Sequence, residues 1–330
     1  MTDKKKKILI TGASSGIGKS IALKLLQEGC IIIGISRTHT IKRKNYIAYT
    51  QDISDLRGFS EVLDEIKKRH RKIYGIVSNA SEGYFDKIEN LSEKKIINYF
   101  NLNLLSHIIL AKKMIPNLKR NKKGIFILMG SESSKVGGEQ GTLYCTAKHA
   151  LLGLTKSLKL EANKSSIRVT IINPGMVRTS FFDNLGFEPG NSKENAIQAK
   201  DIGELVYYII SASRYVNISD INIDPIKKTI IPALLVLTLM FTMSHANATS
   251  SKKNYKLVTV YMPFHQEKAK MLLDAIETMP PRQKDAIVLK YLEEHSNSEI
   301  AYIMESSVEA VESLLGRGKK HLTIKLKGRG

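Results

Sequence analysis

Short apolar runs alternate with amphipathic stretches along the first two thirds of the chain. Apolar residues fill 8–10, 30–35, 73–77 and 125–129, and the stretch from Lys19 to Glu28 has the spacing of a helix. Buried strands that alternate with helices are typical of a parallel sheet covered on both faces. The pattern therefore predicts an α/β fold with a doubly wound, Rossmann-type parallel sheet.

The pattern changes after residues 216–226, which predict the last strand of this sheet. From 268 to 326 the apolar period is helical. Ser296 is placed to cap one helix, and a short turn at 306–307 separates that helix from a second one over 308–322. Two short helices joined by a tight turn predict a small all-α helix-turn-helix domain at the C-terminal end.

A glycine-rich turn, TGASSGIG, joins the first apolar run to the first predicted helix at residues 11–18. Gly12 and Gly16 lack a Cβ, so the chain can turn tightly and bring backbone N–H groups to the positive end of that helix. Gly18 allows helix and strand to pack closely. The spacing differs from GxGxxG, and an ordinary strand-to-helix turn is the alternative. The turn predicts a pyrophosphate site, and hence a bound dinucleotide.

The residue that follows the second strand bears on the choice of cofactor. An acidic residue there would bond the free ribose hydroxyls, whereas the planar, charged guanidinium of Arg37 suits a 2′-phosphate. We therefore predict NADP(H), with a solvated surface arginine as the alternative. Asp52, Ile53, Asn79 and Ala80 follow two further strands, at the carboxyl ends where such sheets bind ligands.

Candidate proton-transfer chemistry lies at Tyr144 and Lys148, which share one face of a predicted helix because they are four residues apart. A nearby ammonium lowers the pKa of a tyrosine from its ordinary value of about 10, so we expect a lowered pKa for Tyr144. Its phenol could then exchange a proton with a carbonyl or alcohol oxygen. Ser131 follows the strand at 125–129, and its hydroxyl would lie beside the same oxygen.

Residues 6 to about 226 resemble a short-chain dehydrogenase/reductase. The resemblance rests on motifs in the family's order and spacing: TGASSGIG, the SNA of 78–80, Asn103, Ser131, the YCTAK of 144–148 and the PGMVRT of 174–179. It implies hydride transfer between a nicotinamide cofactor and the carbon of a carbonyl or alcohol. An intact fold that has lost activity is the alternative.

The resemblance implies a role for each matched residue. Tyr144 would be the general acid/base, Lys148 would tune its pKa and bind the nicotinamide ribose, and Ser131 would polarise the substrate oxygen. Asn103 would hold the water of a proton relay behind Lys148. The implied catalytic set is Asn103, Ser131, Tyr144 and Lys148. The predicted cofactor-binding set is Gly12, Ser14, Ser15, Gly16, Ile17, Gly18, Arg37, Asp52, Ile53, Asn79, Ala80, Tyr144, Lys148, Pro174, Gly175, Val177 and Thr179.

Two residues depart from the family's pattern. Ser81 stands where the family usually has a glycine near the cofactor, and Gly130 replaces a usual serine. The segment between Arg178 and Ala199 is too broken for a long helix, and the resemblance makes it the mobile lid over the substrate. The lid contains Phe181, Phe182, Leu185 and Phe187. These side chains suggest an apolar or ring-bearing carbonyl substrate, with simple packing as the alternative.

Residues 229–262 separate the two predicted domains, 1–228 and 263–330. An apolar run from Ile230 to Met243 follows two lysines and ends in Ala-Asn-Ala, like a secretory signal peptide at an internal position. The run is shorter than the roughly 20 apolar residues that span a bilayer. A marginal membrane anchor over 229–244, a hydrophobic helix packed on the reductase, and a junction of two unrelated coding segments are open interpretations.

The C-terminal stretch, PPRQK through KKHL, resembles the promoter-binding region 4 of an extracytoplasmic-function sigma factor. The resemblance implies contact with DNA or RNA polymerase, and hence a transcription regulator as the second class of function. The implied base contacts are Ser307, Glu309, Ala310, Ser313 and Arg317, with Lys319 and Lys320 on phosphates. A sigma factor's second promoter-binding region is not found, and 14 basic against 10 acidic residues over 251–330 give weak support for independent DNA binding.

Composition adds few constraints. Cys30 and Cys145 lie in unrelated elements, so we expect no disulfide and a cytoplasmic location. The net charge of +20 is mostly lysine spread over the first 228 residues, which favours a solvated, lysine-rich surface, with anionic partners such as nucleic acid or a membrane surface as the alternative. The family resemblance suggests a homo-oligomer that pairs through the helices beginning near Lys95 and Tyr144, and a small carbonyl or alcohol substrate.

Overall fold

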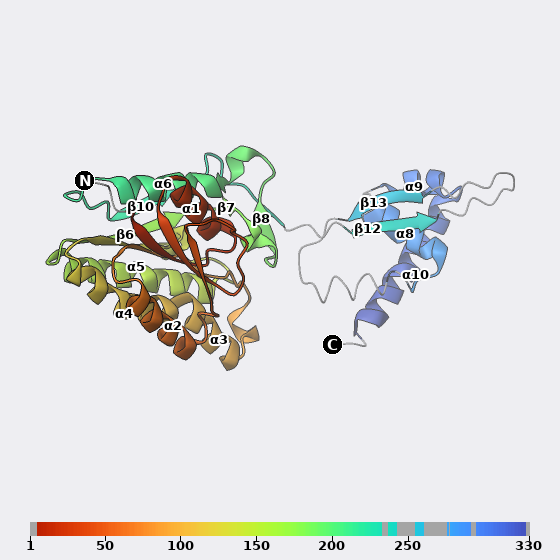
Figure 1. Ribbon diagram of the computed structural model, residues 1–330. Coiled ribbons are helices and arrows are strands. Elements are labelled where there is room, and N and C mark those ends of the chain that lie inside the picture. The colour runs from red at the N-terminus through yellow and green to blue at the C-terminus, as the bar shows by residue number, and fades with distance from the viewer. Residues whose placement is uncertain are drawn as a thin grey trace. The chain divides into compact units, whose positions relative to one another are not determined.

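The structure is a computed structural model that describes residues 5–232, 237–242, 255–260, 276, 278–291 and 295–327. The chain divides into two compact units, Met1–Ile231 and Pro232–Gly330, each considered by itself (Figure 1). The first unit holds the predicted α/β fold and the second holds the predicted helical domain.

Seven parallel strands form the central sheet of the first unit, in the order β3-β2-β1-β4-β5-β6-β10. They are β1 (Lys7–Thr11), β2 (Ile31–Ser36), β3 (Tyr46–Thr50), β4 (Ile73–Ser78), β5 (Gly124–Met129), β6 (Ile167–Pro174) and β10 (Asp220–Ile223). The strand order reverses between β1 and β4, and ligands of such sheets bind outside the carboxyl ends at this switch point. The predicted doubly wound sheet is confirmed.

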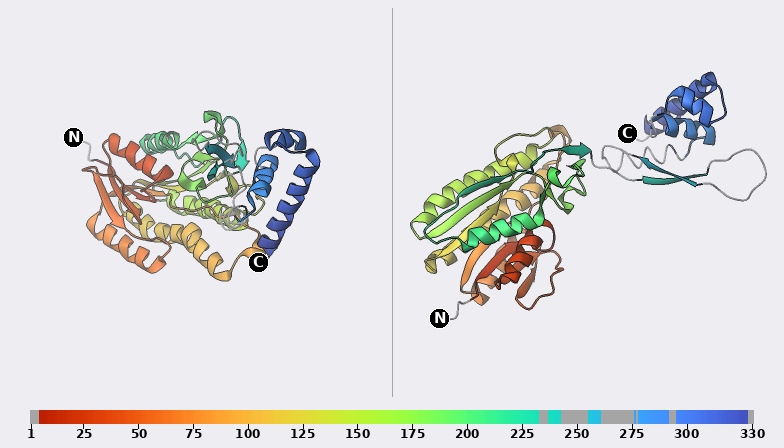
Figure 2. Two further views of the ribbon diagram at one scale, coloured as in Figure 1. Left: turned by 90° about the vertical axis from the view of Figure 1, so that its right-hand side faces the viewer. Right: turned by 90° about the horizontal axis from the view of Figure 1, so that it is seen from above.

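Helices cover both faces of the sheet (Figures 1 and 2). One face carries α1 (Gly16–Gln27) and α6 (Ala199–Ser211), and the other carries α2 (Leu56–Arg69), α4 (Ser106–Arg120) and α5 (Thr142–Asn163). Successive side chains of a strand point to opposite faces. Ile8 and Ile10 accordingly pack with Ile21 and Val206 on one side, and Leu9 packs with Phe59 on the other.

The predicted lid is irregular, as its sequence suggested. Two-residue strands β7 (Val177–Arg178) and β9 (Ile197–Gln198) pair in parallel, and a single 3-10 turn covers Ser180–Phe182. Strand β8 (Phe187–Pro189) pairs with β11 (Ile230–Pro232), which comes after the last sheet strand along the chain. The last sheet strand, β10, is shorter than predicted, because only residues 220–223 pair with β6.

The second unit contains α8 (Pro281–Tyr291), α9 (Asn297–Ile303) and α10 (Val308–Lys327), which pack around a small apolar core (Figure 2). The predicted cap is present: the Ser296 hydroxyl accepts a bond from the Glu299 amide, and the Glu299 carboxylate accepts one from the Ser296 amide. The turn before α10 completes the helix-turn-helix.

The apolar run that begins at Ile230 is extended where the structure describes it. Strand β12 (Leu237–Thr242) pairs antiparallel with β13 (Tyr255–Val260). The hypothesis of a hydrophobic helix is therefore wrong for residues 237–242, because strand pairing satisfies their backbone groups. Among the described residues, no helix has the length and apolar character needed to cross a membrane. The Ala-Asn-Ala of 246–248 lies outside the described residues.

Candidate active site

The glycine turn between β1 and α1 forms a cradle for an anion. Gly12 and Gly16 have φ angles of +69° and +50°, which favour glycine, and a Cβ on Gly18 would lie 2.1 Å from the Gly12 carbonyl oxygen. Ser15 is the N-cap of α1, and among the described residues no side chain bonds the first-turn amides there. Free amides at a helix N-terminus suit a pyrophosphate. The turn therefore fits a dinucleotide.

The end of β4 is fastened to this turn. The Thr11 hydroxyl accepts hydrogen bonds from the amides of Asn79 and Ala80, at 3.0 and 3.2 Å, and the Asn79 side-chain amide donates to the Thr11 carbonyl at 3.1 Å. A Cβ on Gly12 would lie 2.9 Å from the Ala80 Cα. The sequence-predicted residues Gly12, Asn79 and Ala80 are thus brought together at the switch point of the sheet.

The residues predicted to contact the adenosine half lie at the ends of β2 and β3. Arg37 is exposed just after β2. The Asp52 carboxylate accepts two bonds from Ser54, at 2.7 and 2.9 Å, which lower the pKa of Asp52 with a smaller contribution from the Arg37 charge. Ile53 is buried. Arg37 is therefore open to solvent at this end of the sheet, whereas the Asp52 carboxylate closes a turn.

The predicted proton-transfer residues meet beside the end of β5. Ser131 follows this strand, while Tyr144 and Lys148 lie on α5; all three are at least nine-tenths buried. The Lys148 Nζ lies 5.6 Å from the centre of the Tyr144 ring and donates to the Met129 carbonyl at 3.2 Å. Ser131 lies near enough to act as a hydrogen-bond donor that lowers the pKa of the Tyr144 phenol. One serine, one tyrosine and one lysine thus share a single buried site.

The expected lowering of the Tyr144 pKa is wrong for this structure. Burial raises the pKa of Tyr144 to about 12, although the hydrogen bond from Ser131 acts in the opposite direction. Burial also lowers the pKa of Lys148 to about 8. Loss of hydration disfavours the charged form of each group, and it is the largest cause of both shifts. At neutral pH Tyr144 is therefore a phenol, which can donate a proton, and Lys148 is mainly an ammonium.

Asn103 lies in a one-turn π-helix, Asn101–Leu105, inserted between α3 (Glu93–Phe100) and α4. Such insertions occur frequently at functional sites. The Asn103 Oδ1 accepts bonds from the Ser81 hydroxyl at 2.7 Å and the Glu82 amide at 3.0 Å, and its Nδ2 donates to the Tyr99 carbonyl. These bonds hold the loop after β4, and the unusual Ser81 supplies one of them.

The segment after β6 closes the predicted nicotinamide end. Pro174 ends β6, Val177 is buried, and the Gly175 amide donates to the Ile223 carbonyl at 2.7 Å. A Cβ on Gly16 would lie 3.4 Å from the Thr179 side chain, so this segment meets the glycine turn.

Gly130, which stands where the family usually has a serine, also has a local reason. A Cβ there would lie 2.1 Å from the Asn173 Oδ1.

The family model for short chain dehydrogenases matches residues 6–188. The chain belongs to the short chain dehydrogenase family. Members of this family are NAD(P)-dependent oxidoreductases, and the predicted oxidoreductase class is confirmed at this level. The model for sigma-70, region 4, matches residues 269–322, which confirms the predicted second resemblance.

Two curated relatives and one solved structure illustrate the similarity. The 3-oxoacyl-(acyl-carrier-protein) reductase FabG of Buchnera aphidicola is 31% identical over 210 residues, which cover 62% of this chain and 86% of that protein. The L-xylulose reductase of Caenorhabditis elegans is 30% identical over 197 residues, with coverages of 57% and 78%. The alcohol dehydrogenase of Thermococcus sibiricus, complexed with 5-hydroxy-NADP, has a TM-score of 0.62 at 25% identity and covers 68% of this chain and 99% of that one.

Two side chains near this site are not among the residues predicted from the sequence. His107 lies buried on α4, with its Nδ1 2.7 Å from the Ser78 hydroxyl, and burial lowers its pKa to about 3 with a smaller contribution from the Lys148 charge. Phe85 lies with its ring centre 5.2 Å from that of Tyr144. His107 lies four residues after Asn103, which is a signal for the first, whereas nothing in the sequence around Phe85 points to Tyr144.

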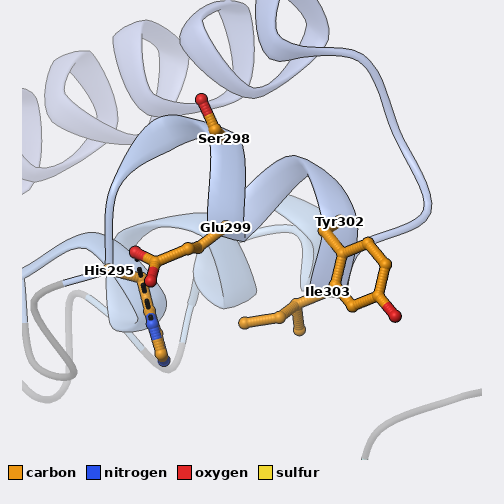
Figure 3. A pocket seen from close by; sticks show the side chains of 5 residues that line it. All are labelled: His295, Ser298, Glu299, Tyr302 and Ile303. Atoms are coloured by element: carbon orange, nitrogen blue, oxygen red, sulfur yellow. Dashed lines mark ion pairs between the residues drawn. The ribbon is translucent and has the colours of Figure 1, made fainter.

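A cavity on the second unit of this short chain dehydrogenase lies against α9 (Figure 3). Its lining is His295, Ser298, Glu299, Tyr302 and Ile303. The Glu299 carboxylate accepts the Ser296 amide at 2.7 Å, and His295 lies 3.9 Å from that carboxylate. Glu299 of this cavity thus belongs to the cap of α9, with His295 beside it, and the chemistry described above lies in the first unit.

Proposed function

We propose that this chain is an NADP(H)-dependent oxidoreductase that interconverts a carbonyl and an alcohol, with Tyr144 as the general acid/base. The observation that carries this proposal is the buried Tyr144 phenol, with Ser131 near it and the Lys148 Nζ 5.6 Å from the centre of its ring. The bound cofactor supplies or accepts the hydride. Tyr144 gives its proton to the substrate oxygen in reduction and takes it back in oxidation.

The neighbours of Tyr144 act on the charge that forms. When the phenol gives up its proton, the Ser131 hydroxyl can donate to the phenolate, and the Lys148 ammonium lies close enough to attract it. Lys148 is itself held by the Met129 carbonyl, which fixes its charge near the end of β5. The glycine turn, Asn79 and Ala80 would hold the cofactor at the switch point between β1 and β4.

We expect Arg37→Asp to shift the cofactor preference from NADPH towards NADH. A charged hydrogen bond is worth about 1.5–3 kcal/mol, so the ratio of kcat/KM for the two cofactors should change by roughly 10- to 100-fold. Steady-state kinetics with both cofactors measures this ratio. Arg43→Asp is the matched control, since Arg43 is exposed in the same connection. A ratio that moves equally in both variants, or in neither, contradicts the 2′-phosphate assignment.

The C-terminal unit supports DNA binding as a second candidate function. The predicted contacts Ser307, Glu309, Ser313 and Arg317 are exposed on or just before α10, and Ala310 is partly exposed. Among the described residues, the one hydrogen bond of the Arg317 guanidinium runs from Nε to the Ser313 carbonyl of its own helix, at 3.4 Å, so its other nitrogens could meet a base.

We expect Arg317→Ala to weaken retention of duplex DNA by the full chain about 10-fold in a gel shift, because a base contact by arginine is worth about 1–3 kcal/mol. Carbonyl reduction by the same variant should be unchanged and serves as its control. An unchanged gel shift removes the proposed role of Arg317.

A further inference from the structure

Aromatic rings converge on Tyr144 from two other segments of the first unit. Phe85 lies in the loop after β4, and Phe181 lies in the lid; their ring centres are 5.2 and 5.9 Å from that of Tyr144. Phe187 stands edge-on to Phe85 at 4.9 Å, and Phe182 contacts both lid rings at 5.3 and 5.9 Å. We call these four phenylalanines the aromatic cluster. Two of them, Phe85 and Phe181, contact the group proposed to donate the proton, and the other two pack behind these rings.

Two glycines make room for the aromatic cluster. A Cβ on Gly83 would lie 2.7 Å from the Phe181 ring, and a Cβ on Gly141 would lie 3.3 Å from the Phe85 ring. A side chain at Gly83 would force Phe181 to move, and one at Gly141 would crowd Phe85. Because neither position has a side chain, the rings of Phe181 and Phe85 can lie close to Tyr144.

The lid that carries three of the rings is tied down. Arg178 donates to the Gly190 carbonyl at 2.6 Å, and the Gly190 amide donates to the Thr229 carbonyl at 2.9 Å. The Asn195 side-chain amide donates to the Thr229 hydroxyl at 2.9 Å and to the Lys227 carbonyl at 3.0 Å. These bonds join the lid to residues beyond the last sheet strand. Rings held in this way are preorganised, which lowers the entropy lost when a ligand binds.

We propose that the substrate carries an aromatic ring next to its carbonyl group, as in an aryl ketone or aryl aldehyde. This inference rests on the proposed function of Tyr144. The carbonyl oxygen would meet the Tyr144 and Ser131 hydroxyls while the ring packs edge-on against Phe85 and Phe181. Such ring pairs are favoured beyond the area they bury. A polyol would instead leave its hydroxyls facing phenylalanine without partners, which is costly.

The test uses three methyl ketones with the same number of carbon atoms: acetophenone, cyclohexyl methyl ketone and 2-octanone. The full chain and NADPH are used, and kcat/KM is measured for each ketone. We expect acetophenone to exceed the cyclohexyl ketone by about 3- to 10-fold, the advantage of a ring pair, and 2-octanone to be the poorest. Equal values for the three, a preference for the chain, or no reduction of any of them by a protein that binds NADPH overturns the aryl assignment.

Two variants separate the aromatic cluster from general packing. Phe181→Leu and Phe85→Leu each keep an apolar side chain but remove a ring, and each should reduce the acetophenone preference to about 1- to 2-fold. Tyr84→Leu is the control, because Tyr84 pairs with Tyr99 at 6.4 Å and with the Lys95 ammonium at 4.1 Å. A preference that survives both phenylalanine variants, or falls equally in the control, overturns the inference. Normal turnover by Tyr144→Phe would instead overturn the proposed function.

Discussion

Tyr144→Phe is expected to lower kcat for carbonyl reduction by roughly 10²- to 10⁴-fold, the usual contribution of a positioned general acid. The variant removes only the hydroxyl that gives up the proton. The ring keeps its contacts with Phe85 and Phe181, so the fold and the affinity for NADPH should change little. NADPH absorbance measures turnover, and a fluorescence titration measures cofactor binding.

The matched control for this experiment is Tyr99→Phe. The Tyr99 ring is also buried, and its hydroxyl donates to the Glu82 carbonyl at 3.1 Å in the same part of the first unit. Its loss should cost about 0.5–1.5 kcal/mol of stability and leave kcat within a few-fold of the wild-type value. If Tyr144→Phe behaved like Tyr99→Phe, another group would have to donate the proton, and the proposed mechanism would fail.

The parts of the site that the sequence predicted are those that local chemistry determines. Gly12 and Gly16 adopt φ angles that other residues avoid, so a glycine-rich stretch between an apolar run and a helix predicts the tight turn that the structure has. Tyr144 and Lys148 share a face because helical geometry places residues four apart together. Ser131 follows a wholly buried strand, which put its hydroxyl at the carboxyl edge of the sheet.

The parts that the sequence could not predict depend on tertiary packing. The pKa of Tyr144 rises because burial removes water from the phenol, and neither burial nor the Ser131 hydrogen bond follows from helical spacing. The Ser81 hydroxyl bonds the Asn103 side chain because α3 and the π-helix return the chain to the end of β4. This contact depends on the tertiary fold and not on the spacing of the two residues in the sequence. The apolar segment over 237–242 pairs as a strand, although its composition had also allowed a helix.

Gly18→Ala is expected to weaken NADPH binding by roughly 5- to 100-fold and to lower the thermal stability of the reductase unit. A methyl group at this position would lie 2.1 Å from the Gly12 carbonyl oxygen and 2.5 Å from the Asn79 side-chain nitrogen. Both the turn and the end of β4 would have to move, and overpacking of this kind costs about 1–3 kcal/mol. A fluorescence titration with NADPH and a thermal melt measure the two effects.

Gly153→Ala is the matched control, because it adds the same methyl group to an exposed position of α5. Among the described residues, nothing lies within 4 Å of the position that its Cβ would take. Alanine in a helix restricts the unfolded chain more than glycine does, so this variant should gain about 0.4–1 kcal/mol of stability and bind NADPH normally. The two substitutions differ only in what the methyl group meets. Unchanged NADPH affinity in Gly18→Ala would show that the turn between β1 and α1 does not hold the pyrophosphate, whatever its resemblance to such sites.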